Sequence, residues 1–183
     1  LNGFADPAEM ATSVRDLGTA MGLSAPSLYN AFGDKHALFV RCLDRYLDNG
    51  LRKRVKRLEA MRSPRQAIET FLEEVVARSL SDPRGCLLVN SALEVGPHDP
   101  EIGAVTAAEL ADIEGFFRRC IRAGQAEGTI SRAHRAADLA RMFLATVMGL
   151  RVLSRSRPDP ALLRGAARQA LALLDAPMSD RPA

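Results

Sequence analysis

Residues 24 to 35 contain polar side chains whose chemistry suits contact with a nucleic acid. Ser24, Ser27 and Tyr29 supply hydroxyl groups, Asn30 supplies an amide, and Lys35 adds a positive charge. Hydroxyls and amides hydrogen-bond to phosphate oxygens and to the edges of bases. Small polar side chains also cover the solvent face of any helical hairpin, so the surrounding elements must decide between the two interpretations.

The residues before this segment predict a short helix and a tight turn. Thr12 or Ser13 can cap the helix. Gly22 can end it in the left-handed conformation, because glycine has no Cβ, and Leu23 would then plug the core at the turn. The residues expected on the inner face of this helix are Val14, Leu17 and Met21.

The residues after the turn predict a second short helix. Ser24 would cap it, Pro26 is tolerated in its first turn, and Leu28 and Phe32 face inward one turn apart. A pair of helices joined this way is a helix-turn-helix, which places its second helix in the major groove of DNA. Because the cap, the glycine turn and the inward pattern agree, we favour this interpretation over an ordinary hairpin. The residues expected to face outward are Ala25, Ser27, Tyr29 and Asn30.

A third helix follows at once. Gly33 would end the second helix, Asp34 would cap the third, and Lys35 would lie in its first turn. The helix dipole disfavours a cation there by about 0.3–1 kcal/mol, whereas a bound anion would reverse that cost. We therefore interpret Lys35 as a phosphate-binding residue, although taken alone it would be an ordinary surface lysine.

The sequence contains no pattern that predicts a metal site, catalysis or a disulfide framework. His36, His98 and His134 are isolated, so no spacing predicts a metal site. There is no phosphate-binding glycine loop, no nucleophile elbow and no paired-carboxylate signature, so we expect neither an enzyme nor a cofactor. Cys42 and Cys120, with Cys86, make an odd and widely spaced set, which argues against a disulfide framework and fits a cytoplasmic protein.

Three residues near the middle of the chain could serve a ligand. Cys86 would lie at the start of a helix, which can lower the pKa of a thiol, but an inert buried cysteine is the favoured alternative to a redox sensor. Asn90 and Glu94 fall one turn apart among apolar neighbours, where they could orient a ligand or satisfy loop amides. Core packing would equally explain the remaining candidate pocket residues, which are Phe71, Val75, Phe116, Phe117, Met142 and Phe143.

Length and charge bound the remaining possibilities. The 183 residues have a net charge of +3 and are 47% hydrophobic, which excludes a polybasic nucleic-acid wrapper and a disordered tail. All of the excess charge lies before residue 63. The basic run Leu51–Leu58 spreads around a helix, so a solvated connecting helix is favoured over long-range attraction to DNA. No apolar run is long enough to cross a membrane.

The remainder of the chain predicts an all-α protein. Strong helix formers dominate, and apolar residues recur at three- and four-residue steps. Helices are expected to begin at Ser63–Pro64 and at Pro100, with a short apolar helix over residues 86–95 between them. Two more helices span Leu139–Leu153 and Leu162–Leu174, and their wide apolar arcs predict a four-helix interface between two copies of the chain.

The segment TSVRDLGTAMGLSAPSLYNAFGDKHALF resembles the DNA-binding domain of TetR (tetracycline-repressor-like) transcriptional regulators. The resemblance implies an N-terminal helix-turn-helix domain over residues 1–48, with its first helix mostly upstream of Leu1 and so truncated, and a helical ligand-binding and dimerisation domain over residues 49–176. It also implies that Ala25, Pro26 and Asn30 lie near base edges. The residues implied to contact DNA, mostly at phosphates, are Thr12, Ser13, Ser24, Ser27, Tyr29 and Lys35.

These observations predict a homodimeric repressor that binds a near-palindromic operator and is released by a small-molecule effector. The alternative is an all-α module that binds a small molecule or a partner and has a vestigial helix-turn-helix. The two differ in whether Tyr29 and Lys35 matter for DNA binding.

Overall fold

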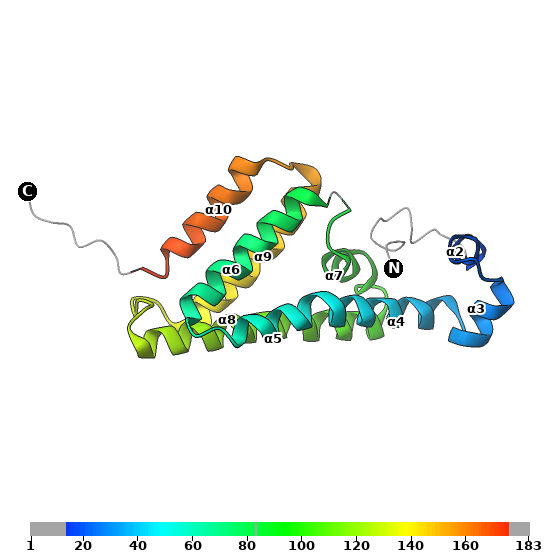
Figure 1. The fold of residues 1–183 in the computed structure, drawn as a ribbon, viewed down its shortest axis with the longest axis horizontal. Helices are drawn as coiled ribbons and strands as arrows, with labels where there is room; N and C mark the ends of the chain where they lie inside the picture. Colours follow the sequence, from blue (N-terminus) through cyan, green and yellow to red (C-terminus); the bar gives the residue numbers. More distant parts are fainter. Residues whose placement is uncertain (1–13, 83, 176–183) are drawn as a thin grey trace, which may run out of the picture. The chain divides into compact units, whose positions relative to one another are not determined.

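A computed structural model describes residues 14–82 and 84–175 of the chain (Figure 1). The described residues form helices, turns and loops without a strand, which confirms the predicted all-α class. The helices are α2 (Val14–Met21), α3 (Ala25–Phe32), α4 (Lys35–Leu47), η1 (Asp48–Arg52), α5 (Lys53–Glu59), α6 (Pro64–Ser81), α7 (Leu87–Asn90), η2 (Ser91–Val95), α8 (Pro100–Glu127), α9 (Ala136–Ser156) and α10 (Pro160–Ala172), where η1 and η2 are π-helical turns.

Side-chain caps begin both α6 and α10. The Ser63 hydroxyl accepts a hydrogen bond from the amide of Gln66 at 3.3 Å, and Pro64 opens α6 as predicted. The Asp159 carboxylate accepts from the amides of Ala161 and Leu162 at 2.8 and 3.3 Å before α10. Such caps replace hydrogen bonds that the first turn of a helix cannot make internally. The start of α6 was predicted from its cap, whereas α10 begins at Pro160, before the predicted Leu162.

The short apolar helix predicted over residues 86–95 takes a mixed form. Only Leu87–Asn90 is α-helical, and Ser91–Val95 continues as a π-turn. Beyond that turn the backbone passes close to α8, since a Cβ on Gly103 would lie 2.9 Å from the carbonyl oxygen of Gly96. A glycine at position 103 is therefore required by this close approach.

The chain divides into two compact units. The first contains the described residues up to Lys53 together with Arg84–Ala107, and the second contains the described residues from Arg54 to Pro83 and from Ala108 onward. The units follow packing rather than chain order, because α7 packs on α4. The predicted domains, residues 1–48 and 49–176, are continuous segments of the chain, whereas these compact units are not. The domain division stays a prediction.

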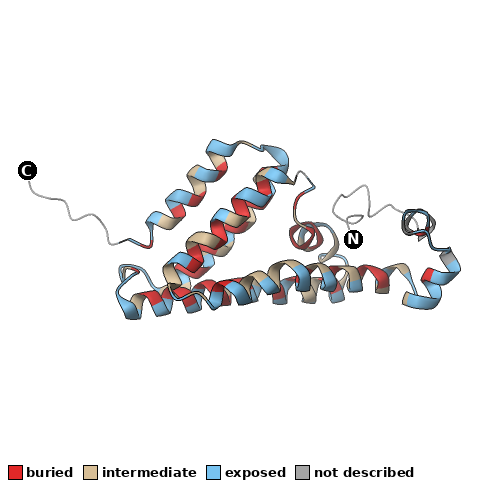
Figure 2. Cartoon of the chain, in the orientation of Figure 1, coloured by how far each residue is buried: buried red, intermediate tan, exposed pale blue. Residues whose placement is uncertain are grey.

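In the second unit, α6, α9 and α10 pack on one another in pairs. Around each helix, buried positions alternate with exposed ones at helical spacing (Figure 2). Four phenylalanine rings meet in the centre of this unit with centroids 5.0 to 5.3 Å apart. They are Phe71, Phe116, Phe117 and Phe143, and each is at most 1% exposed.

The basic run Leu51–Leu58 is largely paired within the chain. Arg52 contacts Asp44 at 2.6 Å and Asp48 at 2.9 Å, and Arg54 lies 3.4 Å from Glu74. Since these arginines already have carboxylate partners, the arrangement supports the connecting-helix interpretation over long-range attraction to DNA.

Candidate nucleic-acid interface

The second helix of the predicted helix-turn-helix is α3, and its start is fixed by Ser24. The Ser24 hydroxyl accepts a hydrogen bond from the amide of Ser27 at 3.2 Å and lies 2.8 Å from the Ser27 hydroxyl. Pro26 lies in the first turn. The turn before it contains Gly22 at φ +67°, and the amide of Leu23 donates to the carbonyl of Gly18 at 2.9 Å. The predicted cap and glycine turn are confirmed.

One detail of the turn was predicted wrongly. Leu23 was expected to plug the core, but its side chain is 45% exposed. The residue after such a glycine often packs against the side chain that lies five positions earlier, at the residue whose carbonyl accepts its amide. Here that residue is Gly18, which offers Leu23 no side chain to contact. An exposed leucine beside α3 adds apolar surface at this end of the chain.

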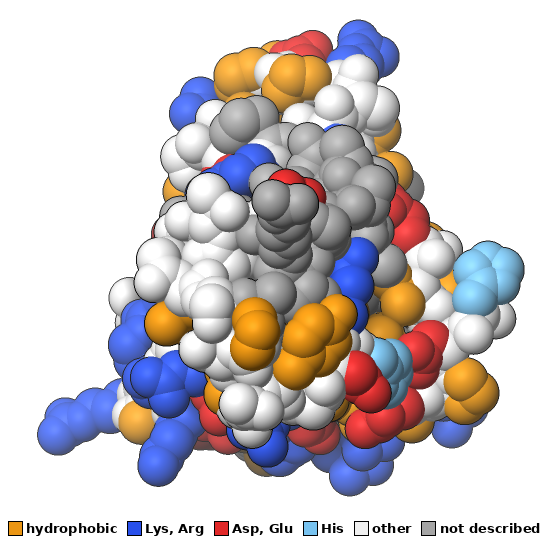
Figure 3. All heavy atoms as spheres, turned by 90° about the vertical axis from the view of Figure 1, so that its right-hand side faces the viewer, with side chains coloured by type: hydrophobic (Ala, Val, Ile, Leu, Met, Phe, Trp, Pro, Cys, Tyr) orange, Lys and Arg blue, Asp and Glu red, His pale blue; other side chains and the backbone are white. Residues whose placement is uncertain are grey.

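The outer face of α3 is open, as expected. Pro26, Ser27 and Asn30 are exposed, and Tyr29 is 50% exposed, whereas Leu28 between them is 2% exposed. Figure 3 looks onto this end of the chain, where apolar side chains reach the surface among polar ones. Ala25 begins α3. An open face of small and amphipathic side chains can approach a phosphate backbone closely.

The start of α4 adjoins this face. Gly33, at φ +86°, ends α3, and the Asp34 carboxylate accepts from the amide of Ala37 at 2.7 Å. Lys35 is the first residue of α4 and is half-buried. The ring of Phe32 lies 5.6 Å from the guanidinium of Arg41, which fixes α3 against α4. The structure thus brings the predicted residues of α3 and the first residue of α4 together in one unit, while Thr12 and Ser13 lie outside the described residues.

His36, isolated in the sequence, has partners in the fold. Its Nε2 lies 2.8 Å from Asp99 and 3.8 Å from Glu101, both at the start of α8. The hydrogen bond from the backbone amide of Ile102 is the largest influence that lowers the pKa of Asp99, and His36 lowers it further. In the part of the chain that the structure describes, no three His, Cys, Asp or Glu residues group as metal ligands.

The predicted ligand residues divide between the two units. Cys86, Asn90 and Glu94 belong to the first. The hydroxyl of Tyr46 donates to the Cys86 sulfur at 3.8 Å, and the buried Asn90 amide donates to the carbonyl of Arg84 at 3.5 Å, while Glu94 is exposed. Asn90 therefore contacts a loop backbone group, which is the alternative role considered for it.

The other predicted pocket residues belong to the second unit. Phe71, Phe116, Phe117 and Phe143 fill its interior by packing on one another, and Val75 is 3% exposed. Rings in mutual contact act as a core, which supports the packing alternative for these residues. Their use by a ligand stays a prediction.

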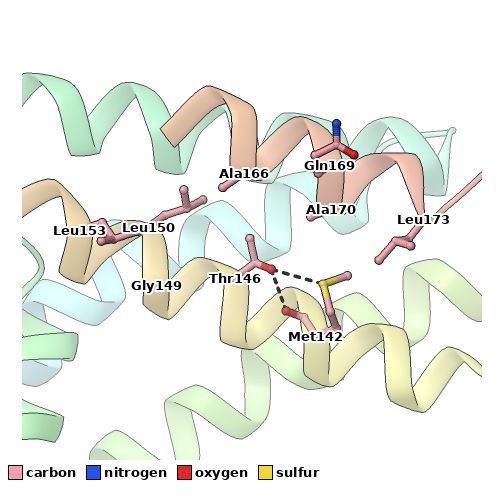
Figure 4. Close-up of a pocket in the computed structure, with 9 residues that line it drawn as sticks. All are labelled: Met142, Thr146, Gly149, Leu150, Leu153, Ala166, Gln169, Ala170 and Leu173. Carbon is pink, nitrogen blue, oxygen red and sulfur yellow. Dashed lines mark hydrogen bonds between the residues drawn. The ribbon is translucent and has the colours of Figure 1, made fainter. Parts of the chain in front are cut away.

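Met142 instead lines an apolar groove between α9 and α10 (Figure 4). The groove has a volume of about 490 Å³. Thr146 donates a hydrogen bond to the Met142 carbonyl at 2.9 Å, so its hydroxyl is satisfied within the helix. The residues that line the groove are Met142, Thr146, Gly149, Leu150, Leu153, Ala166, Gln169, Ala170 and Leu173.

Known proteins resemble the chain over most of its length. Residues 64–170 match the family described as "Tetracyclin repressor-like, C-terminal domain". An uncharacterized HTH-type transcriptional regulator, YezE of Bacillus subtilis, is 29% identical over 168 residues, which cover 90% of this chain and 86% of YezE. The HTH-type transcriptional repressor ComR of Escherichia coli is 28% identical over 151 residues, which cover 79% of this chain and 70% of ComR.

Solved structures agree with these matches. The TetR family transcriptional regulator CifR, a cysteine mutant complexed with 26-bp double-strand operator DNA, is 33% identical with a TM-score of 0.79 and covers 91% of this chain and 88% of its own. A TetR regulator from Chloroflexus aurantiacus is 23% identical with a TM-score of 0.82, covers 93% of this chain and 87% of its own, and supports the fold. Membership of a family of transcriptional regulators agrees with the expectation that the chain is not an enzyme. The family profile, these relatives and the capped α3 together show that the chain belongs to the TetR family of transcriptional regulators.

Proposed function

We propose that this chain is a transcriptional repressor that binds double-stranded operator DNA through α3 and the start of α4. The observation that supports this most directly is the capped α3 with its open face of Ser27, Tyr29 and Asn30. Lys35 lies where the first turn of α4 exposes backbone amides, and both favour a phosphate. Two similar proteins are in keeping with this role, since ComR is named a repressor and CifR was solved with operator DNA.

Most of these contacts would position the protein rather than read the sequence. Hydroxyls and a lysine bind phosphates, whereas Asn30 alone offers an amide with the donor and acceptor pattern that adenine requires. Ala25 and Pro26 would contribute shape at base edges. Affinity should therefore depend strongly on salt, while specificity depends on few side chains.

The groove between α9 and α10 is proposed as the dimer interface. Its lining is mostly apolar, and Leu173, which follows α10 and lines the groove, is 38% exposed. Val152 on α9 lies outside this lining and is 43% exposed. Small residues at positions 166 and 170 would let a partner helix approach closely. A dimer would present two α3 helices to half-sites about 34–36 Å apart, which requires a near-palindromic operator.

Release by a small-molecule effector completes the proposal. An effector lowers DNA affinity only if it binds the DNA-free conformation more tightly, because equal affinity for both conformations shifts no population. A DNA-binding protein of this kind works where the chromosome is, in the cytoplasm. The structure describes no helix long and apolar enough to span a membrane.

The test is a binding titration of the full-length protein against DNA from upstream of its own gene. Tyr29→Phe removes one hydroxyl and should weaken binding several-fold, about 1 kcal/mol for one hydrogen bond. Tyr46→Phe is the matched control, because Tyr46 is half-buried on α4 and its hydroxyl contacts Cys86. Absent binding, or binding insensitive to salt, would favour the alternative of a ligand-binding module with a vestigial helix-turn-helix.

A further inference from the structure

Arg151 is a buried cation in the interior of the second unit. It lies on the inward face of α9 and its residue is 9% exposed. Arg54, in the same unit, has a side chain only 10% exposed, but it lies 3.4 Å from Glu74. Arg151 differs because it is buried without a carboxylate partner. The other arginines of this unit that have carboxylate partners are more exposed, and they are Arg57, Arg65, Arg119, Arg141 and Arg157.

The polar contact of Arg151 is with a hydroxyl rather than a carboxylate. Its Nη1 donates to the Ser79 hydroxyl on α6 at 3.1 Å. Among the described residues, no Asp or Glu lies within ion-pair distance of this guanidinium. A guanidinium has five N–H donors and no acceptor, so a single hydroxyl partner leaves most of its hydrogen-bonding capacity unused.

Ser79 adds a second donor at the same place. Its residue is 2% exposed, and its oxygen accepts the bond from Arg151. Within the described residues, the Ser79 hydroxyl hydrogen has no recorded acceptor. Among the described residues, no Arg151 nitrogen is both buried and without a partner. The N–H groups that do not bond to Ser79 therefore keep some contact with solvent, and an anion could reach them and the Ser79 hydroxyl together.

The surroundings strengthen any such interaction. Residues close to Ser79 and Arg151 in the sequence are also buried. They are Val75 and Val76 on α6 and Val147 and Leu150 on α9. Burial of a charge without a counter-ion is unfavourable. An anion brought to this position would make charge-assisted hydrogen bonds in a poorly hydrated environment, where they are stronger than in water.

We propose that Arg151 and Ser79 bind the carboxylate of a small organic acid, which acts as the effector. The inference rests on the proposed function, because it names the chemical class of the effector in that proposal. One guanidinium and one hydroxyl match the single charge and planar oxygens of a carboxylate, whereas a phosphate dianion would require more cations. The burial of both side chains excludes a macromolecular partner and favours an apolar body attached to the acid.

The experiment compares hexanoate with hexanamide, which has the same shape but no charge. Thermal unfolding of the full chain is followed at fixed protein concentration while each compound is added. Hexanoate is expected to raise Tm and hexanamide is not, because binding to the native state alone stabilises it. Calorimetry then gives the affinity for hexanoate.

Two variants assign the effect to the site. Arg151→Met keeps length and apolar contact and should weaken hexanoate at least tenfold, whereas Ser79→Ala removes one donor and should weaken it several-fold. Arg168→Met is the matched control, because Arg168 is an exposed arginine on α10 without an ion-pair partner in the described chain; it should leave binding unchanged. If Arg151→Met does not fold, Ser79→Ala decides.

Three results would overturn the proposal: no response of the native protein to hexanoate, an equal response to hexanamide, or an unchanged affinity in both site variants. Operator binding is measured on the same samples without ligand. A protein that binds DNA but not hexanoate refutes the carboxylate site and leaves the repressor function standing. A protein that binds hexanoate through Arg151 but does not bind DNA refutes the repressor function instead.

Discussion

The substitution Ser24→Ala separates a contact with DNA from a general loss of stability, because Ser63 provides an almost identical cap elsewhere. Ser24 accepts from the amide of Ser27 at 3.2 Å and Ser63 from that of Gln66 at 3.3 Å. Both capped helices have proline in the first turn. Each alanine variant should lose about 1 kcal/mol of unfolding free energy.

The two variants should differ in DNA affinity. α3 has eight residues, too few to be stable alone, so loss of its cap acts directly on the surface that would meet DNA. A cap of about 1 kcal/mol and a phosphate hydrogen bond of about 1 kcal/mol together predict an affinity about 30-fold weaker. Ser63 caps α6, in the other unit, and its substitution should change affinity less than twofold.

The assay combines urea unfolding with fluorescence anisotropy of labelled upstream DNA. Protein concentration is held fixed, since the stability of a dimer depends on it. The reasoning is refuted if Ser24→Ala leaves DNA affinity unchanged. It is refuted equally if Ser63→Ala weakens binding as much as Ser24→Ala, because the effect would then report stability alone.

Three further outcomes follow from single residues. Lys35→Ala should reduce the slope of log K for DNA binding against log[salt] by about one for each half-site. Lys56→Ala is the control, because Lys56 is exposed. An equal reduction of the slope in both variants would contradict a specific role for Lys35. Phe117 is fully buried with ring centroids of Phe71, Phe116 and Phe143 within 5.3 Å, so Phe117→Ala should cost about 3–5 kcal/mol in urea unfolding, and a loss under about 1 kcal/mol would argue against a packed core. Burial, and secondarily Glu59, raises the pKa of Cys120 to about 11. Only about 0.1% of this thiol is ionised at pH 8, so it should resist a thiol reagent until the protein unfolds. The pKa of the Cys120 thiol in the folded protein lies above the unfolded value of about 8.5. The stability that depends on keeping this thiol protonated is therefore fully present below about pH 8.5 and is lost as the pH rises through about 11. Rapid modification of the native thiol at pH 8 would contradict the raised pKa.

Helix boundaries were predictable because their causes lie within a few residues. The caps at Ser24, Asp34 and Ser63 each join a side chain to an amide three residues later. Gly22 and Gly33 adopt the positive φ that their positions at helix ends require. Such interactions depend on local sequence and little on the rest of the fold, and they also define the helix expected to meet DNA.

The direction of side chains needed the tertiary structure. Leu23 is apolar yet exposed, and four phenylalanines that sequence alone left open between a pocket and a core pack on one another. Apolar spacing shows which face of a helix is buried but not what covers that face, because core, pocket and dimer interface use the same residues. The partners of His36 come from more than 60 residues away, beyond any local pattern.

Arg151 shows most clearly which property of a residue cannot be predicted from sequence patterns. It lies between the buried residues Val147 and Ser154 on the inward face of α9, and neither composition nor charge counts distinguish it from the other arginines. Only the packing of α9 on α6 decided that the guanidinium is buried beside Ser79 and away from every described carboxylate. The sequence by itself determined the helices and the family; the tertiary structure decided which polar groups lost their water, because burial is a property of the packed chain.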